Sequence, residues 1–219
     1  MKRKSPRSTL DPEFGNAGFA ALPADMTQAV SISLLPDSRL LIAGATNEDG
    51  RFAVTCLLDN GQLDPTFGRM GVIRDQLEPY QTAVAVAAFA VEADKTLVVY
   101  NSGTADAPGI IPVIARYQQK DGLLDQSFAS AGVRRLYFPD DAPALSSLAP
   151  SPSAGSSGRS ALTPSGKLVS SWWYTSHGRT VTFRLDEHGQ LDPTFNKVGY
   201  VVLSTLLRNG SVSATLMLA

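Results

Sequence analysis

The sequence is poor in the residues that most often carry metal or covalent chemistry. Its 219 residues include one cysteine, Cys56, and two histidines, His177 and His188. A single cysteine excludes an intrachain disulfide and a zinc site built from several thiolates. Cys56 lies in the apolar run FAVTCLL, so we expect a buried and unreactive thiol. We predict neither a bound metal nor a cofactor.

Excess charge of one sign and long apolar runs are also lacking. Nineteen basic residues nearly balance twenty acidic ones, so no overall field favours nucleic acid or an anionic membrane as a partner. No apolar run is long enough for a membrane helix. The basic residues at positions 2–4 and 7 are not followed by the apolar core of a signal peptide. We expect a cytoplasmic protein with a basic, disordered tail over residues 1–9.

The sequence motifs of common enzyme classes are absent as well. No G-x-S-x-G nucleophile elbow occurs, and no G-x-x-x-x-G-K-[ST] loop could cradle a phosphate. With so few histidines, a Ser/His/Asp arrangement could be assembled only by ignoring sequence context. We therefore expect a protein that is not an enzyme.

What the chain does contain is a six-residue motif written four times. It reads LDPEFG at 10–15, LDPTFG at 63–68, LDQSFA at 124–129 and LDPTFN at 191–196. The positions shared by the copies are a leucine, an aspartate and a phenylalanine: Leu10, Asp11 and Phe14; Leu63, Asp64 and Phe67; Leu124, Asp125 and Phe128; Leu191, Asp192 and Phe195. Self-similarity at such a period is typical of repeat proteins and propellers.

The segments between the motifs repeat too. A glycine stands eight residues after each motif leucine, and another stands two residues before the last three. Between them lie runs of four to eight residues rich in Val, Ile, Leu and Thr, punctuated by Gly, Pro and Asn or Asp. Such runs predict short antiparallel strands, four in each repeat.

We therefore predict an all-β protein, a β-propeller or propeller fragment built of four-stranded antiparallel blades. Residues 10–219 form one propeller-like domain, with repeats at 10–62, 63–123 and 124–190 and a half repeat at 191–219. The half repeat reads as two strands around the turn Asn209-Gly210. The chain then holds about three and a half repeats.

The motif itself has a structural interpretation. Proline suits the first position of a helical turn, and the preceding aspartate can cap that turn by accepting backbone N–H bonds. The residue after the phenylalanine is Gly, Ala or Asn, and Gly and Asn tolerate the left-handed conformation that ends a turn. The leucine and phenylalanine would then pack between strands.

Calcium binding is the alternative interpretation of the repeated aspartates. The carboxylate pairs Asp59/Asp64, Asp121/Asp125 and Asp186/Asp192 suggest it. No acidic ladder with a closing bidentate Glu accompanies them, so we expect capping and not metal binding.

At these residues a family resemblance is plain. The stretch NGQLDPTFGRMGV, preceded by a PDSRLLIAG-type strand, resembles the bacterial delta-60 repeat, an uncharacterised family regarded as β-propeller-like. The resemblance covers nearly all of the chain after residue 9, and the third copy departs from it at Gln126 and Ala129. The family implies no activity and no catalytic residues.

One stretch breaks the repeat pattern, SSWWYTSHGR at 170–179. Trp172, Trp173 and Tyr174 align with the smaller residues 44–46 of the first repeat and 101–103 of the second. Large aromatic residues at such a place suggest an anchor for a partner or a platform for a sugar, with His177 and Arg179 as polar neighbours. Filling a gap in the core is the alternative. We expect one tryptophan to be buried and the other partly exposed.

These observations predict a non-catalytic binding or protein-interaction module on a β-propeller scaffold. A lectin-like protein that binds a small carbohydrate is the alternative, and a hydrolase with a carboxylate-lined central site is a further one. A partial propeller would expose apolar strand edges, so we expect a homodimer in which two chains complete one ring.

Overall fold

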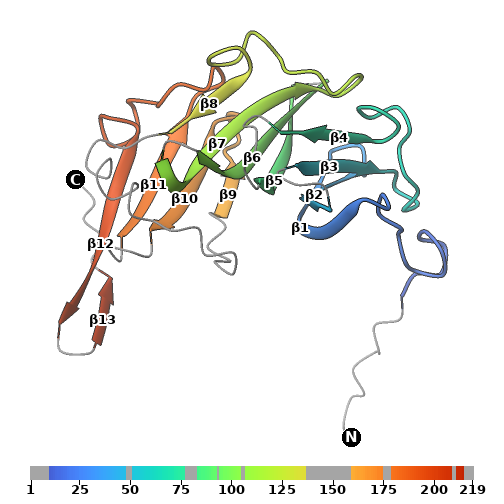
Figure 1. Ribbon diagram of the computed structural model, residues 1–219, viewed down its shortest axis with the longest axis horizontal. Helices are drawn as coiled ribbons and strands as arrows, with labels where there is room; N and C mark the ends of the chain where they lie inside the picture. Colours follow the sequence, from blue (N-terminus) through green and yellow to red (C-terminus); the bar gives the residue numbers. More distant parts are fainter. Residues whose placement is uncertain are drawn as a thin grey trace, which may run out of the picture.

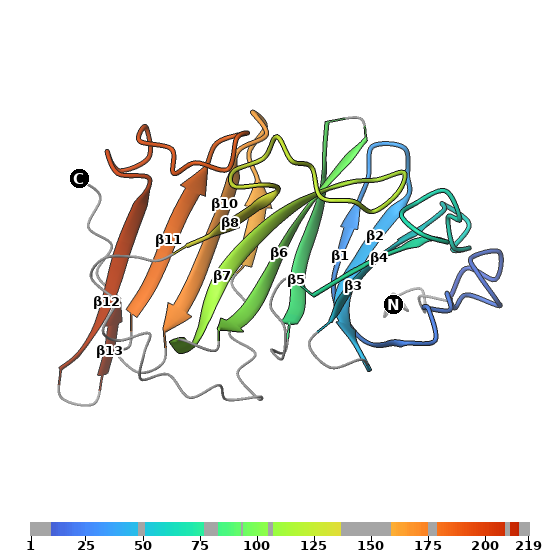
Figure 2. The same cartoon turned by 45° about the horizontal axis from the view of Figure 1, so that its top comes forward.

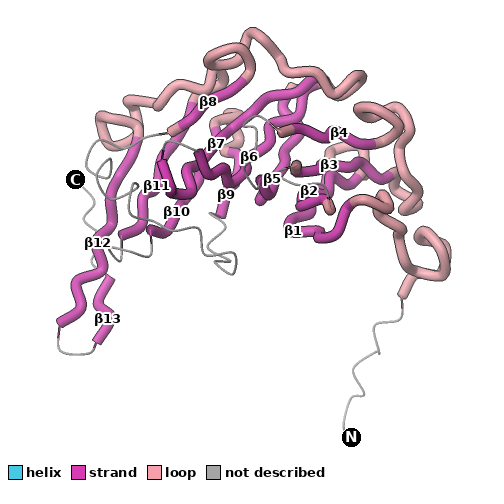
Figure 3. The backbone as a smooth tube through the Cα atoms, viewed as in Figure 1, coloured by secondary structure: helices cyan, strands magenta, loops and turns pink. Residues whose placement is uncertain are grey.

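The computed structural model describes residues 10–47, 51–76, 83–92, 94–104, 107–136, 159–174, 179–208 and 211–214. All regular structure in these residues is strand, as the tube in Figure 3 shows. This confirms the all-β class predicted from the short runs of β-branched residues. No helix in the described part of the chain has the length and apolarity required to cross a bilayer.

The described strands form three antiparallel sheets that follow one another along an arch (Figures 1 and 2). The first sheet holds β1 (Met26–Leu34), β2 (Leu40–Thr46), β3 (Phe52–Leu57) and β4 (Val72–Asp75) in that order. The second holds β5 (Ala83–Val91), β6 (Lys95–Thr104), β7 (Ala107–Gln118) and β8 (Val133–Arg135). The third holds β9 (Arg159–Leu162), β10 (Leu168–Tyr174), β11 (Arg179–Leu185), β12 (Tyr200–Arg208) and β13 (Ser211–Ala214).

The sheets are out of phase with the sequence repeats. Repeats 63–123 and 124–190 each contribute four strands, β4 to β7 and β8 to β11. The first strand of each repeat, however, pairs with the last strand of the repeat before it, as β4 pairs with β3 and β8 pairs with β7. The second, third and fourth motifs therefore each link the third and fourth strands of one sheet, whereas the first motif precedes β1.

The last segment also follows this rule. Strand β12 pairs with β11 through residues 200–204, so it is the fourth strand of the third sheet. Its remaining residues pair with β13, with Arg208 opposite Ser211, as the predicted hairpin requires. The expected turn residues 209–210 lie outside the described part of the chain, as does the tail of residues 1–9.

The main core lies between the sheets. Phe52 of β3 stacks on Tyr100 of β6 with 4.8 Å between ring centroids, which joins the first sheet to the second. Strand β5 is rich in alanine, and its buried residues 83 and 85–88 pack in this core. Small side chains on a strand that faces a neighbouring sheet let the two sheets approach closely, because the distance between packed sheets depends on side-chain size. A smaller cluster, which contains Met26 and Ile42, lies on the other face of the first sheet.

Candidate binding site

The four motif aspartates cap the turns that follow them. Asp64 accepts a hydrogen bond at Oδ1 from the backbone N–H of Thr66 (3.0 Å) and another from its hydroxyl group (2.6 Å). Asp125 and Asp192 are bonded in the same way by Ser127 and Thr194. In the first copy, Oδ1 of Asp11 accepts the N–H of Glu13 (3.0 Å). The cap therefore satisfies backbone donors at the start of each turn.

Each motif forms a tight turn and not a longer helix. The N–H of Phe67 donates to the carbonyl of Asp64, three residues earlier. The next residue has a left-handed backbone in every copy, with φ between 45° and 61° at Gly15, Gly68, Ala129 and Asn196. Ala129 adopts this conformation although alanine has no special tolerance for it. The left-handed residue turns the chain back toward its sheet.

In the second, third and fourth motifs, the other carboxylate oxygen of the aspartate binds a basic side chain that sequence reasoning missed. Oδ2 of Asp64 accepts from Arg39 (2.8 Å). Oδ2 of Asp125 accepts from Arg116 (2.7 Å), and Lys95 lies 3.5 Å away. In the third sheet, Asp192 accepts from both Lys167 (2.7 Å) and Arg184 (2.8 Å). A basic residue at, or one residue before, the start of the second strand of each sheet was the available signal: Arg39, Lys95 and Lys167.

These contacts keep the aspartates ionised although they are buried. Burial alone would raise the pKa of Asp125, but hydrogen bonds from Ser127 and the charge of Arg116 lower it to about 2. Lys167 and Thr194 hold the pKa of Asp192 well below its ordinary value. The place that a calcium ion would take at each carboxylate is thus filled by an ammonium or guanidinium group. Among the described residues, no three Asp, Glu, His or Cys side chains gather as metal ligands would.

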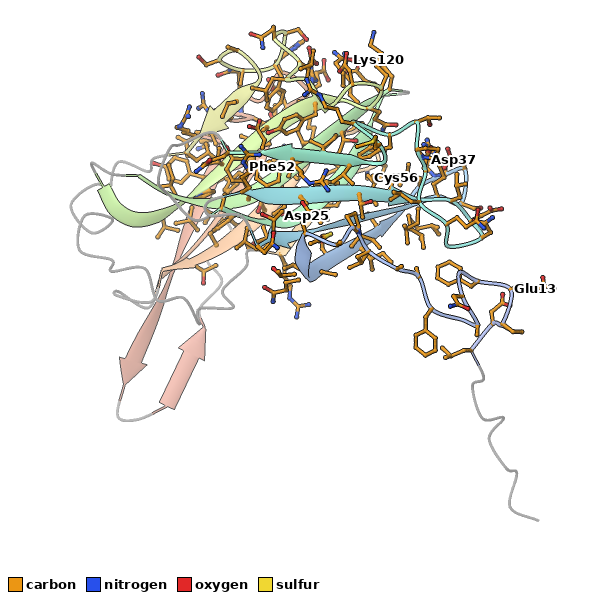
Figure 4. The ribbon with its side chains drawn as sticks, turned by 45° about the vertical axis from the view of Figure 1, so that its right-hand side comes forward. Glu13, Asp25, Asp37, Phe52, Cys56 and Lys120 are labelled. Atoms are coloured by element: carbon orange, nitrogen blue, oxygen red, sulfur yellow. The ribbon has the colours of Figure 1, made fainter. Side chains whose placement is uncertain are left out.

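Cys56 occupies the place that arginine takes in the other two sheets. The N–H of the motif aspartate donates to the carbonyl of Cys56 in the first sheet and to those of Arg116 and Arg184 in the others. Figure 4 shows Cys56 at the end of β3. Burial raises the pKa of its thiol to about 11, opposed in part by the charge of Arg39. The thiol is therefore protonated and unreactive at neutral pH, as expected from the sequence.

The glycines around each motif are required by close packing. A Cβ atom on Gly71 would lie 2.5 Å from the side chain of Leu63, so the glycine eight residues after the leucine makes room for it. A Cβ atom on Gly189 would lie 2.6 Å from the ring of Phe128. This second glycine belongs to the next sheet, so Phe128 packs against the turn of its neighbour. The motif therefore joins adjacent sheets.

A backbone hydrogen bond completes each of these joints. The N–H of Gly15 donates to the carbonyl of Asn60 (2.7 Å), and the N–H of Gly68 donates to that of Gln119 (2.5 Å). In the third copy, the N–H of Ala129 donates to the carbonyl of His188 (3.0 Å). Each acceptor lies in the turn that precedes the next motif. Each of the first three motifs is thus hydrogen-bonded to the turn that precedes the next motif.

The aromatic stretch lies within strands. Trp172, Trp173 and Tyr174 belong to β10, where they pair with residues 179–181 of β11. Trp172 is buried in the main core, and its indole N–H donates to the hydroxyl of Ser170 (2.8 Å). The side chains of Trp173, Tyr174 and Arg179 and the whole of His177 lie outside the described part of the chain. Trp172 therefore serves packing, while the binding role of the other four stays a prediction.

The strand registers agree with the predicted alignment of this stretch to the first repeat and correct its alignment to the second repeat by one residue. Leu41 pairs with Cys56, Leu97 with Arg116 and Val169 with Arg184, so these three positions are equivalent. Counting along the strands from there makes Trp172 equivalent to Gly44 and Tyr100 and not to Asn101. Tyr100 is also a buried aromatic residue. The turn between β5 and β6 is shorter than that between β1 and β2, and this difference misled the sequence comparison.

A cleft with an apolar floor lies where the second and third sheets meet. It has a volume of about 500 Å³. The floor residues come from both sheets and the motif between them: Val91, Leu97, Phe128, Leu162, Leu168 and Leu185. Three carboxylates and one guanidinium stand among the polar lining residues, those of Glu92, Asp186, Glu187 and Arg116, beside His188.

One side-chain difference distinguishes this joint from the joint between the first and second sheets. Tyr117 and Leu185 are equivalent, since Tyr117 pairs with Thr96 and bridges to Leu124, while Leu185 pairs with Leu168 and bridges to Leu191. Tyr117 fills the joint between the first and second sheets, and its hydroxyl group donates to Asp75 (2.8 Å). The third sheet has the smaller leucine at this position, and Leu185 lines the cleft.

The charged residues that line the cleft between the second and third sheets are mainly acidic. The guanidinium of Arg116 is taken up by Asp125, by Ser127 (3.1 Å) and by the carbonyl of Glu187 (2.8 Å). Glu92 lies 3.4 Å from Arg116 and 2.7 Å from Lys95, but Glu187 has only a long contact of 3.7 Å with His188 among the described ion pairs. The opening of the cleft therefore carries more negative than positive charge.

A second groove, of about 660 Å³, runs beside β4 and the turn of the third motif. It is more polar, with Arg51, Arg69 and Arg74 among its lining residues. Arg74 is bound bidentately by Asp25. The cleft between the second and third sheets, with its apolar floor, is the better match to the usual chemistry of a ligand site.

Comparisons with known proteins support a β-propeller-like repeat family. Residues 35–67 match the family model described as a domain of unknown function (DUF5122) beta-propeller. The match covers β2, β3 and the first five residues of the second motif, and it does not carry the delta-60 name. No curated protein matches the sequence.

A comparison with solved structures matches the chain to a GH43 β-1,3-galactosidase with galactodeoxynojirimycin. The two share 12% sequence identity and superpose with a TM-score of 0.34. The match covers 87% of this chain and 45% of the galactosidase chain, so this chain spans less than half of that protein.

Proposed function

We propose that this protein is a non-catalytic binding module on a β-propeller-type scaffold, with its binding site in the cleft between the second and third sheets. In this proposal the three sheets are blades of the propeller. The cleft carries the proposal, because it combines an enclosed apolar floor with a few polar groups at its opening.

The lining chemistry indicates the class of ligand. The floor fits one apolar or aromatic group, and the acidic residues Glu92, Asp186 and Glu187 favour a positive charge beside it. A hydrophobic side chain next to a lysine or arginine of a partner protein has this chemistry, as does a small aromatic amine. The motif aspartates support a non-catalytic role, since Asp64, Asp125 and Asp192 are each engaged in internal ion pairs.

Titration with two probes that share a ring and differ in charge tests this proposal. Tryptamine carries an indole ring and an ammonium group, and indole-3-acetate carries the same ring and a carboxylate. We expect tryptamine to shift backbone amide resonances of residues around the cleft in NMR spectra, and indole-3-acetate to bind more weakly.

Two variants locate the binding. Leu185→Tyr places in the third sheet the residue that the second sheet has at Tyr117, so it should fill the cleft and abolish binding while the fold is kept. Glu187→Gln removes one exposed carboxylate and should weaken tryptamine binding about two- to fivefold, the effect of a solvent-exposed ion pair. Met70→Ala, at an exposed residue of the second motif's hairpin, is the matched control.

The outcomes separate the candidate functions. Binding of tryptamine that survives Leu185→Tyr would show that the site lies elsewhere. Binding of neutral monosaccharides without binding of either indole would favour the carbohydrate-binding alternative. Cleavage of a glycoside substrate that is lost on changing Glu92 or Glu187 would contradict the non-catalytic proposal.

A further inference from the structure

The first sheet has an outer face that turns away from the second sheet. In β2, Leu41 and Ala43 belong to the main core, whereas Ile42 and Leu40 belong to the small cluster on the opposite face. Ile32 of β1 pairs with Ile42, and Leu34 pairs with Leu40. Directly paired residues point to the same side of a sheet. Ile32, Leu34, Leu40 and Ile42 therefore define what we call the outer face of the first sheet.

Two large apolar residues of this face are exposed. Ile32 is 64% exposed and Leu34 is 73% exposed. The equivalent of Ile32 in the second sheet is Ala88, which pairs with Val98 and is only 1% exposed because the first sheet covers it. In the third sheet the equivalent is Ser160. The chain thus has its largest side chain at the one copy of this position that no other sheet covers in the described structure.

The opposite end of the arch has a different chemistry. On the face of the third sheet that turns away from the second, Ser171 and Thr182 share a hydrogen bond of 2.7 Å. The registers place Ser171 where the first sheet has Ala43, and Thr182 where it has Val54. Both positions are apolar and fully buried in the first sheet. The described outer face of the third sheet is therefore a poor match for an apolar surface.

The outer face of the first sheet carries little net charge that would select an oppositely charged partner. Arg74, which pairs with Ala53 on this face, is bound by Asp25. None of the nine residues of β1 is charged. Asp37 and Arg39, in the adjoining turn, pair with each other at 2.8 Å. The whole chain has a formal net charge of −1, so two copies repel each other little.

We propose that the outer face of the first sheet is a self-association surface, on which a second copy of this chain packs with the same face across a two-fold axis. Ile32 and Leu34 of each copy would then be covered by their counterparts, in the way that one sheet packs on another in a β-sandwich. This arrangement differs from a ring-completing dimer, which would set the outer face of the first sheet against that of the third. Two outer faces of first sheets match each other better than the outer faces of a first and a third sheet do. The outer face of the first sheet is apolar, and that of the third sheet carries hydroxyl groups.

Sedimentation velocity over a range of micromolar concentrations tests the proposal. We expect the wild-type protein to show a monomer–dimer equilibrium. The double variant Ile32→Glu/Leu34→Glu should sediment as a monomer throughout, with unchanged circular dichroism, because both side chains are already exposed. Met70→Glu adds the same charge at a residue that is 84% exposed elsewhere, and it should leave the equilibrium unchanged.

A third variant separates the two possible dimers. Thr182→Glu places a charge on the outer face of the third sheet and should not affect a dimer formed by the outer faces of the first sheets. Loss of the dimer in both Thr182→Glu and Ile32→Glu/Leu34→Glu would overturn our arrangement in favour of the ring-completing one. A wild-type protein that is monomeric at every concentration would overturn both. Neither result would bear on the cleft, which Ile32 and Leu34 do not line.

Discussion

The first motif and the other three have nearly the same letters and very different surroundings. Asp64, Asp125 and Asp192 are buried and bound by basic side chains, whereas Asp11 is exposed and caps its own turn. Figure 4 shows Glu13 of the first motif on a loop that stands away from the first sheet. The three buried aspartates bind basic side chains that lie in, or one residue before, earlier strands of their own sheet. The six-residue motif encodes a capped turn. The neighbouring strands decide whether the aspartate of that turn is buried and ion-paired.

Truncation of the motif phenylalanines should show the largest difference. Phe67 is fully buried in the main core, so Phe67→Ala should lower the free energy of unfolding by about 3–5 kcal/mol. Phe14 is half-buried, so Phe14→Ala should cost about 1–2 kcal/mol. Urea denaturation of both variants measures the difference. Equal costs would show that the first motif is as firmly docked as the second.

The aspartates should differ in the same direction by a somewhat smaller amount. Asp125→Ala leaves the buried guanidinium of Arg116 without its closest carboxylate, which should cost about 3 kcal/mol. This is the lower end of the usual range, because Arg116 keeps its bonds to Ser127 and to the carbonyl of Glu187. Asp11→Ala removes only a cap and should cost about 0.5–1 kcal/mol. A loss below 1 kcal/mol for Asp125→Ala would show that its ion pair does not stabilise the fold.

Stability should fall in acid, over a window that the buried aspartates set. The pKa of Asp125 is lowered from 3.8 to about 2 in the folded protein. The stabilisation from its ionised form is therefore complete above pH 4 and is lost as the pH falls toward 2. We expect the melting temperature of the wild-type protein to decrease over this interval. The Asp125→Asn variant, already destabilised at pH 7, should show a shallower decrease, and a parallel decrease would contradict the assignment.

Metal removal should have the smallest effect. Because Asp64 binds Arg39 and Asp192 binds Lys167, we expect neither calcium nor a chelator to change the melting temperature. Differential scanning calorimetry with calcium and with EDTA measures this. A sharp drop with EDTA would revive the interpretation of the repeated carboxylates as calcium ligands.

Much of the local structure could be predicted from the sequence. The glycine and asparagine after Phe67 and Phe195 predict a left-handed turn end, because short-range sterics alone decide it. The capping by Asp64 depends only on residues two positions away, so it was also predictable. The runs of β-branched residues predict strands for the same local reason.

What the sequence could not show was how strands far apart share their neighbours. The phase of the sheets, with β4 paired to β3, depends on long-range hydrogen bonds that a repeat pattern leaves open. The partners of Asp125 lie on two other strands, and nothing in the six letters identifies them. The same holds for Trp172, whose true equivalents appeared only with the strand registers.

The sequence by itself determined that this chain makes short strands punctuated by four capped turns, because turns and strands depend on neighbours a few residues away. Only the tertiary structure decided which turns became buried ion-paired joints, since a buried aspartate needs a basic partner from another strand. The tertiary structure also decided where the chain has room for a ligand. Leu185 is an ordinary core residue in the sequence, and only the packing of the third sheet beside the second makes it part of the wall of a cleft.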